Sequence, residues 1–516
     1  MQTASLLGQK KEKTVIDYIF ENAEEHGDKS AVTDRKTTLS YGMLAEKVPV
    51  IAGYIRTIGV KKGDRVIIEA VSGCDYVLVY LALQYIGAVT APVERGIKPE
   101  LLEYLADITD AGLFICHTEL SSAKVRSKTY SDILRNAESW NVSIAADTGE
   151  KDSPSEIIFT TGTTGKPKAC FHTIKNISAN TENTVSGMNM LGSDCVLIPL
   201  PLNHSFGMRV LRAVFETGAS AVVQSGAVFF DAIRKSIADN HCTAMVCVAA
   251  TMESILREAG DEAVKEVFYG LRYIEFSAGA APVHLREKLV ELLPDTHIHN
   301  TWGSSESGGC VFIDVSERPD KMTALGKSIG GTILEMWSDE KNDFIDEYGP
   351  EHTGRLAIYG DMIFSGYWNQ PELYSDAVRD GWLITKDMVW RDKDGYFYML
   401  GRADDIINVG GEKVAPSEIE EIAQNISDIG DCACVGVADE DGVLGQIPVL
   451  FYTERAGAKV DIERLKGEFA RKVGLMKAPR HFVRLDEIPR NYMKKKDYKL
   501  LKNEIWKKYE VRAYAG

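Results

Sequence analysis

Hydrophobic positions over residues 14–146 alternate between helical spacing and short extended runs. Residues 15–20 repeat with a helical period, whereas residues 65–69 contain a β-branched run, Val66 to Ile68, between Arg65 and Glu69. Strands that alternate with helices form βαβ units, in which the strands run parallel. We therefore expect an α/β fold, with a large N-terminal domain of parallel-rich sheets flanked by helices.

The longest apolar stretch covers residues 76–93. Gln84 and Gly87 interrupt it and Pro92 lies near its end, so it is too short and too broken to span a bilayer. It predicts a buried helix that runs into a strand. The first 13 residues are polar and lack the apolar core of a signal peptide. We expect no membrane span and a cytoplasmic location.

Length, charge and cysteine content bear on the number of domains, the class of partner and the state of the thiols. With 516 residues, the chain exceeds one ordinary core and should form at least two domains. Its 59 lysines and arginines against 75 aspartates and glutamates give a net charge of −16, which disfavours a nucleic-acid partner. The nine cysteines contain no CxxC pair, and this usage predicts reduced thiols rather than disulfides or a zinc site.

A threonine- and glycine-rich loop at residues 159–169 is the strongest chemical signal. Glycines bring backbone N–H groups close to an anion, four threonines offer hydroxyls, and two lysines supply charge. A Walker loop has four residues between its glycines, whereas only two separate Gly162 from Gly165. The loop therefore predicts phosphate binding outside the P-loop class.

Further motifs follow in order. Small residues at 277–282 come after a predicted strand at 273–276, and a segment with one glutamate follows at 300–306. The others lie at 380–387, 401–420 and 489–496. Together with the threonine loop, these motifs resemble those of the adenylate-forming superfamily, which includes acyl-CoA synthetases, adenylation domains and firefly luciferase.

This resemblance implies a domain at 1–402 with the ATP and acyl sites, and a small mobile α+β domain at 403–516. It places the ATP phosphates, ribose and adenine on seventeen positions. These are Thr160, Thr161, Gly162, Thr163, Thr164, Gly165, Lys168, Gly279, Ala280, Ala281, Pro282, Asn300, Trp302, Gly303, Ser305, Asp387 and Arg402. It also places magnesium on Glu306, the hinge at Asp404 and the catalytic lysine at Lys495.

The resemblance implies an acyl pocket and a thiol channel as well. The pocket residues are His204, Phe206, Met208, Gly279 and Gly303, and the channel residues are Gly410 and Gly411. His204 is expected to close over the acyl group between two half-reactions. Ser205 stands where amino-acid-activating members have an aspartate, so a free amino acid is not the expected substrate.

Arg209 and Arg212 lie three positions apart on the helix predicted after His204, and residues at this spacing share one helix face. A solvated basic face is the favoured interpretation of the two arginines. The alternative is that Arg209 points into the acyl pocket and pairs with a second carboxylate or a polar head group.

The sequence departs from the family pattern at a few places. Lys386 and Lys494 stand where glycine is usual, and Trp302 replaces a tyrosine. We predict an ATP-dependent acid:thiol ligase, an AMP-forming acyl-CoA synthetase that uses ATP, Mg²⁺ and CoA on a small carboxylic acid. The alternatives are an adenylation enzyme that loads a carrier-protein phosphopantetheine, and a nucleotide-binding homologue without catalysis.

Overall fold

The computed structural model describes residues 13–120, 122, 124–161, 167–224, 229–277, 281–410, 412–439, 443–490 and 496–509, with the backbone alone at 161 and 413. The chain divides into two compact units. The first comprises the described parts of Met1–Leu334 and Ala357–Ile384, and the second those of Glu335–Leu356 and Thr385–Gly516. The boundary predicted after residue 402 marks where the C-terminal domain is expected to rotate. A division into compact units does not report on movement, so this boundary stays a prediction.

A nine-stranded sheet forms one half of the first unit. Its strands from β13 to β1 run parallel, whereas β14, β15 and β2 pair antiparallel at the two edges. In spatial order the strands are β15 (Lys327–Ser328), β14 (Gly308–Asp314), β13 (His297–Ser304), β12 (Tyr273–Phe276), β11 (Ala244–Cys247), β9 (Cys195–Ile198), β10 (Ser220–Val223), β1 (Ser30–Thr33) and β2 (Thr38–Ser40).

A seven-stranded sheet forms the other half. Its strands from β7 to β6 are parallel, and β8 and β19 are antiparallel. In spatial order they are β19 (Gly366–Tyr367), β8 (Pro167–Thr173), β7 (Pro154–Thr161), β4 (Val89–Val93), β3 (Arg65–Glu69), β5 (Leu113–Cys116) and β6 (Arg126–Thr129). The predicted helix-to-strand stretch is α3 (Cys74–Tyr85) followed by β4, both buried. The predicted parallel-rich α/β fold is confirmed.

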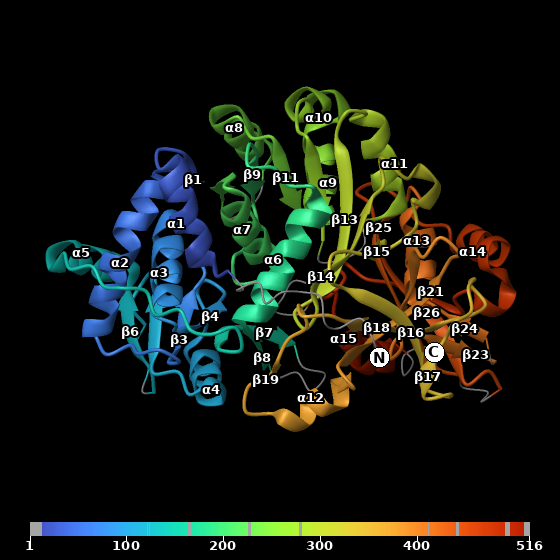
Figure 1. The fold of residues 1–516 in the computed structure, drawn as a ribbon. Coiled ribbons are helices and arrows are strands. Elements are labelled where there is room, and N and C mark those ends of the chain that lie inside the picture. Colours follow the sequence, from blue (N-terminus) through green and yellow to red (C-terminus); the bar gives the residue numbers. More distant parts are fainter. Residues whose placement is uncertain are drawn as a thin grey trace. The chain divides into compact units, whose positions relative to one another are not determined.

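Helices of the first unit cover these sheets, and α1, α2 and α3 pack against one another (Figure 1). Thr14 and Thr173 begin two of the helices with capping boxes, in which side chain and backbone hydrogen-bond reciprocally. The helices besides α3 are α1 (Val15–His26), α2 (Tyr41–Thr57), α4 (Pro99–Thr109), α5 (Tyr130–Trp140), α6 (Ile174–Met188), α7 (Ser205–Thr217), α8 (Phe230–Asn240), α9 (Ala249–Ala259), α10 (Asp261–Phe268), α11 (Val283–Leu292), η1 (Pro319–Lys321) and α12 (Pro371–Ala377). Within the described residues, no helix has the length and apolar composition needed to cross a bilayer.

Residues 333–402 contribute a six-stranded sheet. Its strands are β17 (Asp343–Phe344), β16 (Ile333–Ser338), β18 (Gly354–Tyr359), β21 (Trp382–Arg391), β20 (Val378–Arg379) and β22 (Phe397–Arg402), which pairs with β21. The end of the chain is α+β, as predicted. It contains β23 (Ile407–Val409), β24 (Glu412–Val414), α13 (Pro416–Gln424), β25 (Ile429–Ala438), β26 (Gln446–Glu454), α14 (Ile462–Lys477), β27 (His481–Arg484), α15 (Tyr498–Leu500) and the π-helix η2 (Leu501–Ile505).

Helix α7 carries two buried arginines, and each pairs with a glutamate from a different sheet. Arg209 donates to the carboxylate of Glu275 on β12. Arg212 donates to Glu156 on β7, with nitrogen–oxygen distances of 2.9 and 3.1 Å. The favoured interpretation of a solvated basic face is therefore wrong, because the helix is buried along its length from Phe206 to Phe215.

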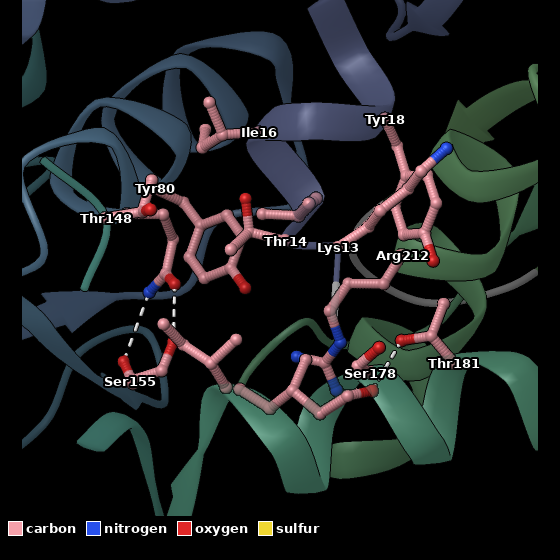
Figure 2. A pocket seen from close by; sticks show the side chains of 14 residues that line it. Lys13, Thr14, Ile16, Tyr18, Tyr80, Thr148, Ser155, Ser178, Thr181 and Arg212 are labelled. Carbon is pink, nitrogen blue, oxygen red and sulfur yellow. Dashed lines mark hydrogen bonds between the residues drawn. The ribbon is translucent and has the colours of Figure 1, made fainter. Parts of the chain in front are cut away.

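Arg212 also lines a pocket of the first unit. Figure 2 shows its side chain there together with those of Tyr80, Ser155 and Ser178. The hydroxyl of Tyr80 donates to Glu156 at 3.3 Å, so the Glu156 carboxylate has two donors. Burial of a carboxylate is tolerated when such donors replace its water.

We predict that Arg212→Met lowers the free energy of unfolding by about 3–5 kcal/mol, because it leaves Glu156 as an unpaired buried charge. The double variant Arg212→Met/Glu156→Leu should recover most of this loss. Urea unfolding of the wild type and of the single and double variants measures the coupling. Arg234→Met is the control, since its pair with Asp231 is exposed, and it should cost about 1 kcal/mol or less. Additive losses in the double variant would contradict the prediction.

Candidate nucleotide-binding site

The threonine loop lies between two hairpin strands. β7 ends at Thr161 and β8 begins at Pro167, and the two strands pair antiparallel with Thr160 opposite Lys168. The predicted loop residues Gly162, Thr163, Thr164 and Gly165 lie outside the described residues. Both Thr160 and Lys168 are half-buried, so the structure places a hydroxyl and an ammonium group at the base of the loop.

Tyr367 connects Lys168 to the predicted magnesium ligand. The Lys168 ammonium lies 5.0 Å from the centre of the Tyr367 ring, and the Tyr367 hydroxyl donates to Glu306 Oε1 at 2.9 Å. Burial, together with the negative charge of Glu306, raises the pKa of Tyr367 well above its ordinary value. The phenol therefore stays protonated at neutral pH and continues to donate to the carboxylate. No sequence motif pointed to Tyr367.

Glu306 lies in the tight turn between β13 and β14. Its backbone N–H donates to the Ser304 hydroxyl at 3.2 Å, and its carbonyl accepts from the Phe364 N–H at 2.8 Å. The turn depends on two glycines. A Cβ at Gly303 would lie 2.1 Å from the Gly308 carbonyl oxygen, and Gly308 has a φ of +62°, which favours glycine. The predicted Gly303 is thus required by a close backbone approach.

The small-residue motif and the Asn300 motif are in contact. The backbone N–H of Ala281 lies 3.5 Å from Asn300 Oδ1, and its carbonyl accepts from Arg286 Nε at 2.7 Å. Asn300 and Ala281 are buried, whereas Pro282, Trp302 and Ser305 are half-buried. Gly279 and Ala280 lie outside the described residues.

The predicted acyl-pocket residues occur at the start of α7. His204 precedes the helix and is half-buried, and Phe206 and Met208 are buried. Met208 lies in the core, where its sulfur accepts from the Tyr76 hydroxyl at 3.6 Å. Arg209 lies 5.0 Å from the Phe206 ring centre.

Arg209 also connects Phe206 to the β13–β14 pair. A Cβ at Gly309 would lie 3.2 Å from Arg209 Nε, and Gly309 pairs with Gly303 across the two strands. Arg209 thus contacts Phe206 and approaches Gly309, the register partner of Gly303. The sequence favoured a solvated position for Arg209 and did not predict this buried contact.

Within the second unit, Asp387 and Arg402 face each other directly across β21 and β22. Next to them, Lys386 donates to Asp404 at 2.6 Å. The Lys386 ammonium is the main cause of the lowered pKa of the Asp404 carboxyl. The lysine that replaces the usual glycine therefore binds the predicted hinge residue.

Paired backbone segments flank both the predicted thiol channel and the motif of the predicted catalytic lysine. Gly410 lies between β23 and β24 with a φ of +61°, and Gly411 lies outside the described residues. Arg490 pairs with Lys496 in an isolated bridge, and Lys495 is outside the described residues. Lys496 is largely buried and donates to Glu420 at 2.9 Å, so this lysine has a structural partner.

The pocket shown in Figure 2 is separate from these motifs, since none of the predicted site residues lines it. The cysteines lie mostly in the interior. All nine lie in the described residues as free thiols, and all but the half-buried Cys195 are buried.

Comparison with known proteins identifies the family. The family model described as AMP-binding enzyme matches residues 19–368, and the model of its C-terminal domain matches residues 418–495. A 2-succinylbenzoate–CoA ligase of Bacillus mycoides is 25% identical over 501 residues, which cover 96% of this chain and 99% of the relative.

Solved structures agree. An o-succinylbenzoate CoA synthetase from Bacillus subtilis, in complex with its acyl-adenylate intermediate, matches with a TM-score of 0.83 and 20% identity, over 96% of this chain and 99% of that one. ATP-bound MatB from Rhodopseudomonas palustris matches with a TM-score of 0.85 and 21% identity, over 96% and 100%.

The fold and the motifs thus define an α/β nucleotide-binding enzyme with a C-terminal α+β part. The chain belongs to the family of AMP-binding enzymes. The resemblance to the adenylate-forming superfamily is confirmed.

We predict that Tyr367→Phe weakens Mg²⁺-dependent ATP binding by about tenfold or more, because loss of a hydrogen bond that orients a metal ligand typically costs this much. The phenylalanine ring stays beneath Lys168, so the change is confined to the hydroxyl. Calorimetric titration of ATP with and without Mg²⁺ measures the effect.

Tyr374→Phe is the matched control for this prediction. The centres of the Tyr374 and Phe364 rings lie 5.2 Å apart, and Phe364 also packs against Tyr367. The Tyr374→Phe variant should bind MgATP like the wild type. An unchanged Mg²⁺ dependence in Tyr367→Phe would contradict the role given to the hydroxyl.

Proposed function

We propose that the protein activates a carboxylic acid with ATP, using Glu306, Lys168 and Lys495, and transfers the acyl group to the thiol of CoA. It is an ATP-dependent, AMP-forming acid–CoA ligase. The observation that carries the residue assignment is the cluster of Lys168, Tyr367 and Glu306 at the base of the threonine loop. It supplies both a cation for phosphates and a carboxylate for a metal ion.

The chemistry has two steps. The carboxylate oxygen bonds to the α-phosphorus of ATP, the bond from that phosphorus to pyrophosphate breaks, and acyl-AMP forms. The thiol sulfur of CoA then bonds to the acyl carbon, AMP leaves, and the thiol proton passes to solvent. The first step converts a poor leaving group into a good one, so the second needs positioning more than strong activation.

Glu306 fits the expected magnesium ion. Mg²⁺ prefers oxygen ligands, keeps several waters and uses one or two carboxylates together with phosphates. Glu306 is a half-buried carboxylate, and one of its oxygens accepts from a neutral phenol. When bound, the ion would neutralise charge on the pyrophosphate part of ATP.

The remaining roles follow the resemblance. Thr160 and Lys168, with the loop between them, bind the β- and γ-phosphates. Asp387 accepts hydrogen bonds from the ribose hydroxyls, and Arg402, opposite it on β22, contacts ribose or phosphate. Adenine lies between residues 279–282 and Trp302.

Lys495 is the proposed catalytic lysine, which offsets charge that develops between the carboxylate and the α-phosphate. The neighbouring Lys496 is a poor candidate, because it is committed to Glu420 and lies 3.6 Å from Asp431. Rotation about Asp404 would remove Lys495 before the thiol enters along Gly410 and Gly411. Lys386, bound to Asp404, is well placed to influence that rotation.

We propose an acid with an apolar acyl group, aliphatic or aryl. The charge of Arg209 is already neutralised by Glu275, so it is not available to a second carboxylate. The acceptor is CoA, as in the names of the relatives; a carrier-protein phosphopantetheine is the alternative. We place the enzyme in the cytoplasm, where ATP and CoA are supplied.

Pyrophosphate release over a panel of aliphatic, aryl and dicarboxylic acids, with and without CoA, tests this function. We predict acid-dependent release that yields a CoA thioester, detected by mass spectrometry, with the fastest rates for apolar monocarboxylic acids. Adenylate without thioester would redirect the acceptor to a carrier protein. Absence of pyrophosphate release with every acid, despite normal ATP binding, would contradict ligase activity.

We predict that Lys495→Ala slows pyrophosphate release by about 10²–10³-fold, as expected for loss of one fixed electrostatic group in the transition state. ATP binding should change little, because the lysine acts on the reacting atoms. The neighbouring Lys494→Ala serves as the matched control and should retain most activity. Equal losses in both variants would contradict the assignment.

A further inference from the structure

Four side chains of the kinds that bind metals gather where β13 begins and β14 ends. His297 and His299 belong to β13, Asp314 ends β14, and Glu317 follows three residues later. His297 Nδ1 lies 2.6 Å from Asp314 Oδ2 and 3.8 Å from Glu317 Oε1. The ligand atoms of His297, Asp314 and Glu317 all lie within 4.8 Å of one another.

Strand geometry puts His299 on the same face of the strand pair, beside the three side chains whose ligand atoms lie within 4.8 Å of one another. Residues two apart on a strand point to the same face, so His297 and His299 lie side by side, with ring centres 6.0 Å apart. His299 is directly opposite Asp314 in the antiparallel register. A His-x-His pair on one strand and a carboxylate on the next thus share one face.

An ordinary ion pair explains only part of this cluster. It accounts for His297 and Asp314 but leaves His299 unexplained. His299 is 6% exposed, and its Nδ1 has no hydrogen-bond partner among the residues that the structure describes. A buried polar atom without a partner is costly unless something else satisfies it.

Neighbouring groups already have partners of their own or bind only one oxygen of Asp314. Ser316 donates to Asp314 Oδ1 through its backbone and its hydroxyl, which leaves Oδ2 facing His297. Arg272, the nearby cation, is bound to Asp194 at 2.6 Å. The carboxylates of Asp314 and Glu317 thus both face His297 Nδ1.

We propose that His297, His299, Asp314 and Glu317 bind a divalent transition-metal ion of the zinc type. Imidazole with carboxylate suits zinc, nickel and cobalt, whereas magnesium prefers oxygen alone. The ion would replace the direct contact between His297 Nδ1 and Asp314 Oδ2. The site is separate from Glu306, since β13 from His297 to Ser304 spans roughly 20 Å at about 3.3 Å per residue. The proposal does not depend on the ligase function.

The test is calorimetric titration of Zn²⁺ into the full-length protein after EDTA treatment and dialysis, with the half-buried Cys195 replaced by serine to remove its thiol. We expect one saturable site at micromolar concentrations that excess Mg²⁺ does not displace. His297→Ala and Glu317→Gln should each weaken it by about tenfold or more. Glu317 is 68% exposed, so its variant should fold normally.

His284→Ala is the matched control, because His284 forms an exposed pair with Glu253 at 3.5 Å and should leave Zn²⁺ binding unchanged. Co²⁺ provides a second readout, since its visible spectrum should show nitrogen and oxygen ligation in the wild type and lose that signal in His297→Ala. Absence of a saturable Zn²⁺ site, equal binding in His297→Ala, or displacement by Mg²⁺ would overturn the proposal and leave an ion pair alone.

Discussion

The first unit depends on the two ion pairs of α7. Arg212 binds Glu156 on β7 of the seven-stranded sheet, and Arg209 binds Glu275 on β12 of the nine-stranded sheet. β7 leads into the threonine loop, and β12 leads into the small-residue motif at 277–282. One buried helix therefore ties together the two strands that present the nucleotide motifs. Unpaired charges at these depths would be prohibitive, so each arginine needs its glutamate.

Helices and strands were predicted correctly where the residues of a single segment were enough to indicate them. The β-branched run at residues 65–69 is strand β3, the strand predicted at 273–276 is β12, and the helix expected after His204 is α7. The stretch 76–93 became a buried helix and strand because its breaks at Gln84 and Gly87 fall where α3 ends and β4 is about to begin.

Contacts between residues far apart in the sequence could not be predicted from it. The spacing of Arg209 and Arg212 correctly placed both on one helix, but helical periodicity does not reveal that a helix is enclosed on all sides. Tyr367 lies in a two-residue strand without a motif, about 60 positions from Glu306, and its role emerges only from the contact between them. In the sequence, Lys386 was only a departure from the usual glycine. The structure shows that its side chain binds Asp404.

The family, the fold class and the acid–CoA ligase function predicted from ordered motifs are confirmed by the comparisons. The residue roles are proposals that rest on matching positions and on the contacts around them. The cluster of Lys168, Tyr367 and Glu306 brings together three segments that are far apart in the sequence. Its ammonium group suits a phosphate and its carboxylate suits magnesium.

The most direct test of the central claim follows the oxygen atoms of the acid. The substrate acid is labelled with a heavy oxygen isotope in both carboxylate positions, and the AMP and pyrophosphate are analysed by mass spectrometry after turnover with CoA. Attack of the carboxylate on the α-phosphorus predicts one labelled oxygen in AMP and none in pyrophosphate. Label in pyrophosphate or orthophosphate, or ADP as the nucleotide product, would contradict an acyl-AMP intermediate.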